Sequence, residues 1–229
     1  MAAAQHFAST YAEARSKFLA APGARDFAVL SQALPDLRGA DGEELAMDVA
    51  WLGPDDPDAV FVLTSATHGI EGHCGSGAQI GLLHDDAFVQ EARAADIAVL
   101  FIHAVNPHGF SHGRRVNEDN VDLNRNFRDF DGRLPDNAAY AEIHTILLPA
   151  TWPPPKESEA AIDAYIAKHG DGPFQGALTG GQLGDPYGLF YGGARATWSN
   201  RTLRAVFRRH AAGRRRIAWI DFHTALGPR

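Results

Sequence analysis

Residues 59–105 begin with AVFVLTSA (59–66) and end with DIAVLFIHAV (96–105), two short apolar runs rich in β-branched residues. Such runs are typical of strands that are buried on both faces of a sheet. Between them, GSGAQIGLLHDDAFVQEARA (75–94) predicts a helix that starts with small residues. The order strand, helix, strand predicts a βαβ unit, and such units are built on parallel strands.

The sequence on either side extends this unit. We predict an amphipathic helix at 8–20, a strand at 44–52 before the turn GPDDPD, a basic helix at 200–212, and a third buried strand within RRRIAWIDFHT (214–224). Together these elements predict an α/β fold whose central sheet is mostly parallel or mixed, with helices on both faces.

The length of 229 residues suits one α/β domain, so we predict that residues 1–229 form a single domain. Residues 149–200 differ in composition, with PATWPPP, a predicted helix at 157–168 and a stretch rich in glycine and aromatic residues. This segment is too short and too polar to form a core of its own. We therefore predict an irregular insertion that lies over the functional site.

Bulk composition excludes several classes of protein. A net charge of −7 argues against nucleic-acid binding, which normally requires a basic surface. One cysteine, Cys74, excludes an internal disulfide and fits a reducing compartment. The N-terminal residues are neither a signal peptide nor a membrane span, so we expect a cytoplasmic protein without a membrane partner. The sequence does not define its oligomeric state.

Potential metal ligands follow two of the predicted strands directly. THGIEGH (67–73) offers His68 and Glu71 in a turn whose glycines let both side chains converge, and DFHT offers His223. In open α/β sheets ligands bind beyond the carboxyl ends of the strands, where all three residues are expected. Two imidazoles and one carboxylate are the donors of a catalytic zinc whose fourth position stays open. We predict one Zn²⁺ ion here.

Asp221 and four further histidines each allow two interpretations. Asp221 precedes His223 by two residues, so both side chains point to the same face of a strand. Asp221 either orients the imidazole, as carboxylates near zinc ligands do, or is simply a polar residue at a strand end. Four further histidines compete as ligands, and we expect each to be solvated or hydrogen-bonded instead: His73, His103, His108 and His112.

The segment NPHGFSHGRRVNEDNVDLNRNF (106–127) combines arginines with asparagines after a predicted buried strand. A charge-rich segment is usually a solvated loop, but this one alternates acids, amides and arginines without a helical pattern. Arginine suits carboxylate recognition because its planar fork makes two parallel hydrogen bonds. It also suits an oxyanion that develops only in a transition state.

These motifs resemble the zinc carboxypeptidases of the carboxypeptidase A type. The matching pieces are H-x-x-E at 68–71, NPHGF at 106–110, R-x-N at 115–117, DLNRNF at 122–127 and the late His223. The glycine-rich stretch FQGALTGGQLGDPYGLFYGGARATWSN resembles a little-characterised bacterial branch of that family.

The resemblance implies a role for each matched residue. It implies zinc bound by His68, Glu71 and His223. Asp122 would be the carboxylate that contacts His68 without binding the metal. Arg115 would polarise the scissile carbonyl. Asn124 and Arg125 would bind the terminal carboxylate of a small peptide or an acylated amino acid.

The chain departs from the family pattern after the third ligand. A general-base glutamate follows that ligand in the family, whereas no glutamate follows His223 here. We therefore expect an incomplete domain that lacks its C-terminal strands and has little or no hydrolase activity by itself. Two alternatives stay open: an N-acyl amino acid deacylase resembling aspartoacylase and succinylglutamate desuccinylase, and an inactive remnant that binds zinc or a small anion.

Overall fold

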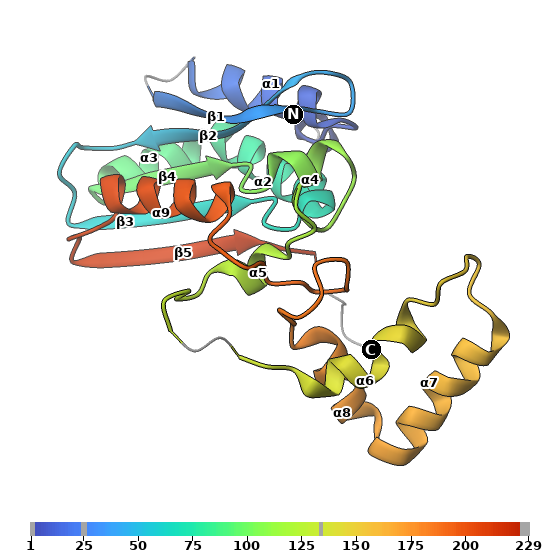
Figure 1. The fold of residues 1–229 in the computed structure, drawn as a ribbon. Helices are drawn as coiled ribbons and strands as arrows, with labels where there is room; N and C mark the ends of the chain where they lie inside the picture. The colour runs from blue at the N-terminus through green and yellow to red at the C-terminus, as the bar shows by residue number, and fades with distance from the viewer. Residues whose placement is uncertain (1–2, 24–26, 133–134, 225–229) are drawn as a thin grey trace. The chain divides into compact units, whose positions relative to one another are not determined.

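The computed structural model describes residues 3–23, 27–132 and 135–224. The chain forms two compact units (Figure 1). One comprises Met1–Glu118 together with Trp198–Arg229, and the other comprises Asp119–Thr197.

The first unit is built on a five-stranded mixed sheet with the order β1-β2-β4-β3-β5. β3 is parallel to both β4 and β5, whereas β2 is antiparallel to β1 and to β4. The predicted α/β fold with a mixed central sheet is thereby confirmed. The strands are β1 (Ala28–Arg38), β2 (Glu44–Leu52), β3 (Ala59–Ser65), β4 (Ile97–His103) and β5 (Arg216–Phe222).

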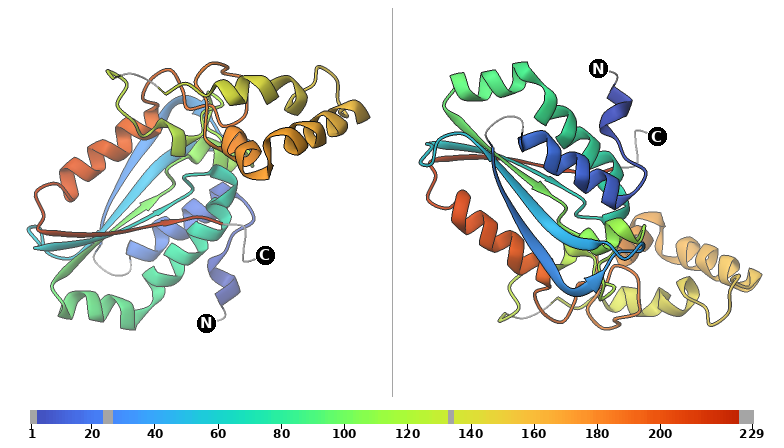
Figure 2. Two further views of the ribbon diagram at one scale, coloured as in Figure 1. Left: turned by 90° about the horizontal axis from the view of Figure 1, so that it is seen from below. Right: turned by 90° about the horizontal axis from the view of Figure 1, so that it is seen from above.

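Helices cover both faces of this sheet. Figure 2 shows α1, α2 and α3 on one face and α9 on the other. The larger helices of the unit are α1 (Tyr11–Gly23), α2 (Gly72–His84), α3 (Asp86–Ala94) and α9 (Trp198–His210). Its shorter helices, among the described residues, are η1 (Ala3–His6), η2 (Gly69–Glu71) and α4 (Pro107–Ser111).

The core of this unit lies between the central strands and the helices α1 to α3. Phe18, Leu63, Leu83 and Phe101 each expose 1% or less of their surface and belong to one cluster. Burying a side chain of this size contributes about 1.5–3 kcal/mol relative to exposure. The apolar runs that predicted β3 and β4 therefore supply the packing that fixes the two strands.

Three elements differ from the sequence-based expectation. The helix predicted at 75–94 is two helices, because the Asp85 side chain accepts hydrogen bonds from Ala87 N and Phe88 N and so caps a new helix, α3. β5 was predicted to be buried, but it forms an edge of the sheet and leaves Trp219 51% exposed. β1 was not predicted, because it is largely exposed and contains Pro35 in the stretch where its register with β2 shifts.

The second unit is helical and has a small core of its own. Tyr140, Ile143, Phe174 and Ala177 are buried together in it. The helix predicted at 157–168 is confirmed. The helices of this unit are α5 (Leu123–Asn126), α6 (Ala138–Leu147), α7 (Lys156–His169) and α8 (Asp171–Thr179).

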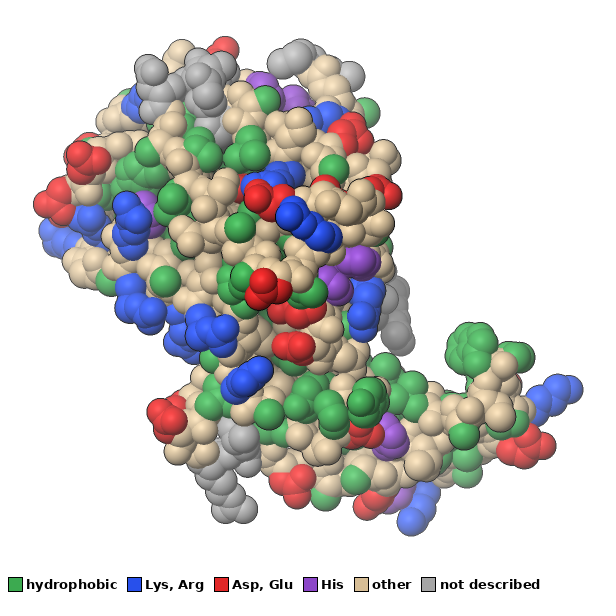
Figure 3. All heavy atoms as spheres, turned by 45° about the horizontal axis from the view of Figure 1, so that its top comes forward, with side chains coloured by type: hydrophobic (Ala, Val, Ile, Leu, Met, Phe, Trp, Pro, Cys, Tyr) green, Lys and Arg blue, Asp and Glu red, His purple; other side chains and the backbone are tan. Residues whose placement is uncertain are grey.

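The surface carries charges of both signs. Acidic and basic side chains are interspersed on the face shown in Figure 3. Within the described part of the chain, no helix combines the length and apolar character that crossing a membrane requires.

Candidate metal centre

The turn after β3 brings His68 and Glu71 to the carboxyl edge of the sheet. Gly69 is required there, because a Cβ atom at this position would lie 2.0 Å from the backbone carbonyl carbon of Gly109. Gly69 N and Ile70 N donate to the carbonyl oxygens of Arg115 and Arg114, at 3.2 Å and 3.0 Å respectively. The backbone around both predicted ligands is thus held by the loop that follows α4.

His68, Glu71 and His223 converge on one point. Each offers one ligand atom, and these three atoms lie within 4.8 Å of one another. His223 Nδ1 is 3.4 Å from Glu71 Oε2, and the rings of His68 and His223 are 5.0 Å apart. Thr224 N donates to the same Glu71 oxygen at 2.7 Å, which ties the segment after β5 to the turn after β3.

The donor set fits one zinc ion. Two ligand atoms on the same tetrahedral zinc lie about 3.3 Å apart, so small side-chain movements would complete the coordination. His68 is only 3% exposed, whereas the side chain of His223 is 30% exposed. The cluster is therefore anchored on one side and open to solvent on the other, as an accessible fourth position requires.

Arg115 lies against two of the three candidate ligands. Its Nη2 is 2.8 Å from His68 Nε2, and its Nη1 is 3.7 Å from Glu71 Oε1. A guanidinium can only donate, so His68 Nε2 accepts this bond and carries no proton. The Arg115 side chain is 41% exposed, which leaves a positive charge at the rim of the cluster.

Asp221 lies beside His223, with its Oδ2 2.6 Å from His223 Nε2. Asp221 is in β5 and His223 follows directly after this strand. The carboxylate of Asp221 reaches the His223 ring nitrogen that does not face Glu71. The arrangement can orient the His223 ring.

The other predicted site residues belong to the second unit, Asp119–Thr197. Asp122 is fully buried, and its side chain accepts from Asn124 N at 3.0 Å as the cap of α5. Arg125 donates through Nε and Nη2 to the carbonyl oxygen of Thr179, and its guanidinium lies 5.7 Å from the centre of the Phe190 ring. The roles of Asp122, Asn124 and Arg125 toward metal and substrate stay predictions.

His103 is fully buried under α2 and belongs to the core rather than to the metal centre. Its Nε2 lies 2.8 Å from Ser76 Oγ, and its ring stacks on Phe18 at 4.6 Å. Burial lowers the pKa of His103 to about 4, with a smaller opposing effect of the charge on Asp48. The ring is therefore neutral near pH 7.

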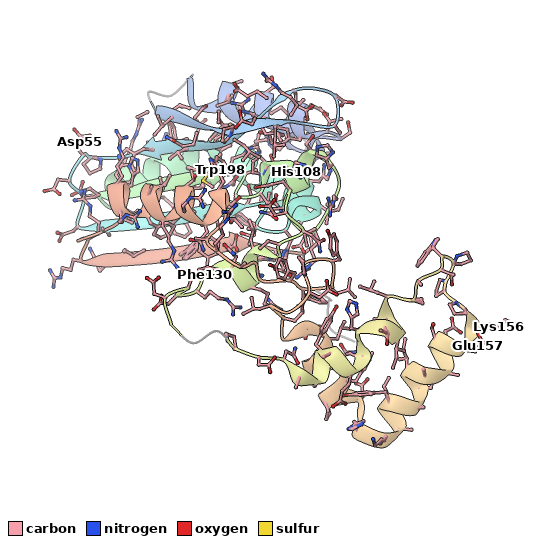
Figure 4. The ribbon with its side chains drawn as sticks, viewed as in Figure 1. Asp55, His108, Phe130, Lys156, Glu157 and Trp198 are labelled. Carbon is pink, nitrogen blue, oxygen red and sulfur yellow. The ribbon has the colours of Figure 1, made fainter. Side chains whose placement is uncertain are left out.

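The other histidines that could have been ligands also lie outside the group formed by His68, Glu71 and His223. His73 Nδ1 is 3.1 Å from the carbonyl oxygen of Ala8. His108 lies on α4 (Figure 4) and packs against His112, with ring centres 4.3 Å apart. Among the described residues, only His68, Glu71 and His223 form a group spaced to hold an ion.

Thr64 and Thr67, whose hydroxyls contact Asp221, were not predicted from the sequence. One signal was available for Thr64, because it and Ser65 are the two polar residues that end an otherwise apolar strand. Threonine is also an ordinary β-branched strand residue, so composition alone does not identify such a role.

Comparison with known proteins yields one family. A family model described as "Protein of unknown function (DUF2817)" matches residues 7–229. No curated protein matches the chain.

Two solved structures illustrate the structural neighbours. One is the "Putative carboxypeptidase A" from Shewanella denitrificans OS-217, with 20% identity, 52% of this chain covered and a TM-score of 0.40. Another is a metallo-carboxypeptidase from Burkholderia cenocepacia, with 18% identity, 50% of this chain covered and a TM-score of 0.36. The matches span 31% and 32% of those two chains, and likeness at this level does not define an activity.

Proposed function

Since the chain belongs to the DUF2817 family of proteins of unknown function, we propose a function from its own site: a zinc-dependent hydrolase that cleaves an amide bond next to a free carboxylate. The observation that carries this proposal is the convergence of His68, Glu71 and His223 within 4.8 Å at one edge of the sheet. The substrate would be a small peptide or an acylated amino acid.

In this proposal the three residues hold one Zn²⁺ ion. When bound, the ion supplies Lewis-acid polarisation of a carbonyl group and lowers the pKa of a water molecule towards ~7. Because the His223 side chain is partly exposed, substrate and water would approach the ion from the side of the cluster on which His223 lies.

Arg115 stabilises negative charge that develops on the carbonyl oxygen. Its guanidinium already lies at the cluster, against His68 Nε2 and near Glu71 Oε1. Donors that are fixed before the reaction stabilise a developing oxyanion without a cost of reorganisation. Substrate binding would draw Arg115 away from His68 and towards the reacting carbonyl.

The remaining assignments concern orientation and anchoring. Asp221 orients His223, and Asp122 supports His68 as a further carboxylate. Asn124 and Arg125 bind the free carboxylate of the substrate, for which the planar fork of arginine is suited. That role requires Arg125 to exchange its hydrogen bonds with Thr179 for bonds to the substrate.

The metal site is tested by elemental analysis of the purified protein. We expect about one zinc per chain, and loss of that zinc in His68→Ala and in Glu71→Ala. His108→Ala is the matched control, because His108 lies on α4 outside the cluster, and it should keep the metal. Full zinc occupancy in His68→Ala would show that the ligands are misassigned.

The reaction is tested with zinc-loaded protein and a panel of blocked dipeptides and N-acyl amino acids, each as free acid and as amide. Incubations must be long enough to detect slow turnover. We expect zinc-dependent cleavage of the free acids and much weaker cleavage of the amides. Preference for N-acyl amino acids over dipeptides would identify a deacylase. Absence of cleavage across the panel would reject the hydrolase.

A further inference from the structure

Hydrogen bonds connect Trp219 through Thr64 to Asp221, and from there to His223. Trp219 Nε1 lies 2.9 Å from Thr64 Oγ1, which lies 2.7 Å from Asp221 Oδ1. Asp221 Oδ2 then lies 2.6 Å from His223 Nε2. All four residues belong to β3, β5 or the residue directly after β5.

The chemistry of each group determines the direction of these bonds. The indole N–H can only donate, so Thr64 Oγ1 accepts from Trp219. The single hydroxyl proton of Thr64 is then available for Asp221 Oδ1. Thr67 donates its own hydroxyl proton to the same oxygen at 3.0 Å. Oδ1 thus accepts two hydroxyl bonds, and Oδ2 is left to face His223.

The sheet fixes the positions of these groups. Thr64 and Asp221 are partners in the parallel register of β3 and β5. Thr64 is fully buried and Thr67 is 5% exposed, so neither hydroxyl has water as a ready alternative partner. The two hydroxyls therefore hold the Asp221 carboxylate in one orientation.

We propose that Thr64 is a positioning residue for the metal centre, acting with Thr67 through Asp221 on His223. The carboxylate holds a proton on His223 Nε2, which leaves Nδ1 as the nitrogen that donates to the metal. His223 Nδ1 is also the nitrogen that faces Glu71, at 3.4 Å. The effect on metal binding rests on the proposed zinc site, whereas the hydrogen bonds among Trp219, Thr64, Thr67, Asp221 and His223 do not depend on zinc.

A purely structural role for Thr64 makes a different prediction. If its hydroxyl only satisfied the Trp219 indole, removing that hydroxyl would affect stability and leave the state of His223 unchanged. Partners that orient zinc-bound histidines typically change metal affinity 10- to 100-fold when they are removed. The two roles are therefore separable by measurements made on His223 and on zinc.

The first measurement is the tautomer of His223 in the metal-free protein, from long-range ¹⁵N–¹H correlation spectra. We expect the Nε2–H tautomer in the wild type and in Thr64→Ser, which keeps the hydroxyl. A mixture of both tautomers is expected in Thr64→Val. An Nδ1–H tautomer in the wild type would overturn the proposal.

The second measurement is zinc affinity, from competition with a chelator. We expect Thr64→Val to bind zinc 10- to 100-fold more weakly and Thr64→Ser to bind it like the wild type. Thr202→Val, on α9 and outside this set of hydrogen bonds, is the matched control and should change nothing. Wild-type affinity and a wild-type tautomer in Thr64→Val would overturn the proposal.

Two further outcomes are distinguishable. If Thr64→Val does not fold, Thr67→Val carries the same test, because Thr67 lies outside the sheet and donates to the same oxygen. If the wild type binds no zinc, the proposed function fails, while the tautomer measurement still decides the role of Thr64.

Discussion

The candidate metal centre draws its residues from two unlike regions, the buried centre of the sheet and its exposed edge. His68 follows the central strand β3 and is 3% exposed. His223 follows the edge strand β5, and its side chain is 30% exposed. His68 is buried and accepts a hydrogen bond from Arg115, whereas exposed His223 is held by its hydrogen bond to Asp221 and by the bond from the neighbouring Thr224 N to Glu71. A site can thus combine one residue that is both buried and hydrogen-bonded with another that is positioned by polar contacts alone.

The largest expected effect is at the central turn. Gly69→Ala would place a methyl group 2.0 Å from the Gly109 carbonyl carbon and 2.3 Å from Phe110 N, both of which are backbone atoms that cannot rotate away. We expect a loss of about 3 kcal/mol in the free energy of unfolding, measured by urea denaturation, together with loss of zinc. Gly176→Ala is the control, because nothing lies within 4 Å of its added methyl group. Equal stability of the two variants would mean that the central turn is less rigid than its packing indicates.

The next effect is the response of the buried centre to acid. Burial lowers the pKa of His103 to about 4, whereas the unfolded chain has the ordinary value of 6.5. Between these values the unfolded state binds the proton and the folded state does not, so stability falls as the pH decreases from 6.5 to 4. The full loss below pH 4 is about 3 kcal/mol.

This pH dependence is measured as the free energy of unfolding in urea at pH 7 and at pH 4.5. His103→Gln should flatten the profile between these two values, because the titrating ring is gone. His169→Gln, at an exposed position in α7, should leave the wild-type slope. An unchanged slope in His103→Gln would assign the acid sensitivity to other groups.

The smallest expected effect compares the centre and the edge directly. Val60 of β3 and Ile217 of β5 are partners in register, but Val60 is 1% exposed and Ile217 is 49% exposed. Val60→Thr buries a hydroxyl and should cost about 1–2 kcal/mol. Ile217→Thr should cost about 0.5 kcal/mol or less, because water still reaches the position. If both variants lost a similar free energy of unfolding, measured by thermal or urea denaturation, the β5 edge would have to be covered in solution.

The sequence predicted the structure correctly where a local pattern of residues is compatible with only one kind of element. The apolar runs at 59–66 and 96–105 predicted β3 and β4, and the parallel order predicted that residues after β3 and β5 would meet at one edge. That expectation led to His68, Glu71 and His223, whose ligand atoms do converge. The H-x-x-E spacing alone would not have been sufficient.

Other features depend on neighbours that no single segment reveals. RIAWIDF is as apolar as a buried strand, so its sequence does not show that β5 forms an edge of the sheet. β1 was missed because Pro35 and many exposed positions break its alternation. Thr64 acquires its role only from the register that places it beside Asp221.

The hydrogen bond from Thr224 N to Glu71 Oε2 joins residues 153 positions apart in the sequence. It closes a loop of the chain that contains the strands β4 and β5 and the whole second unit. An ion shared by Glu71 and His223 would reinforce the same closure, so metal binding and attachment of β5 would be thermodynamically linked. Conditions that detach the edge strand would then release the ion, and removal of the ion would speed hydrogen exchange in β5 before it affects β3 or β4.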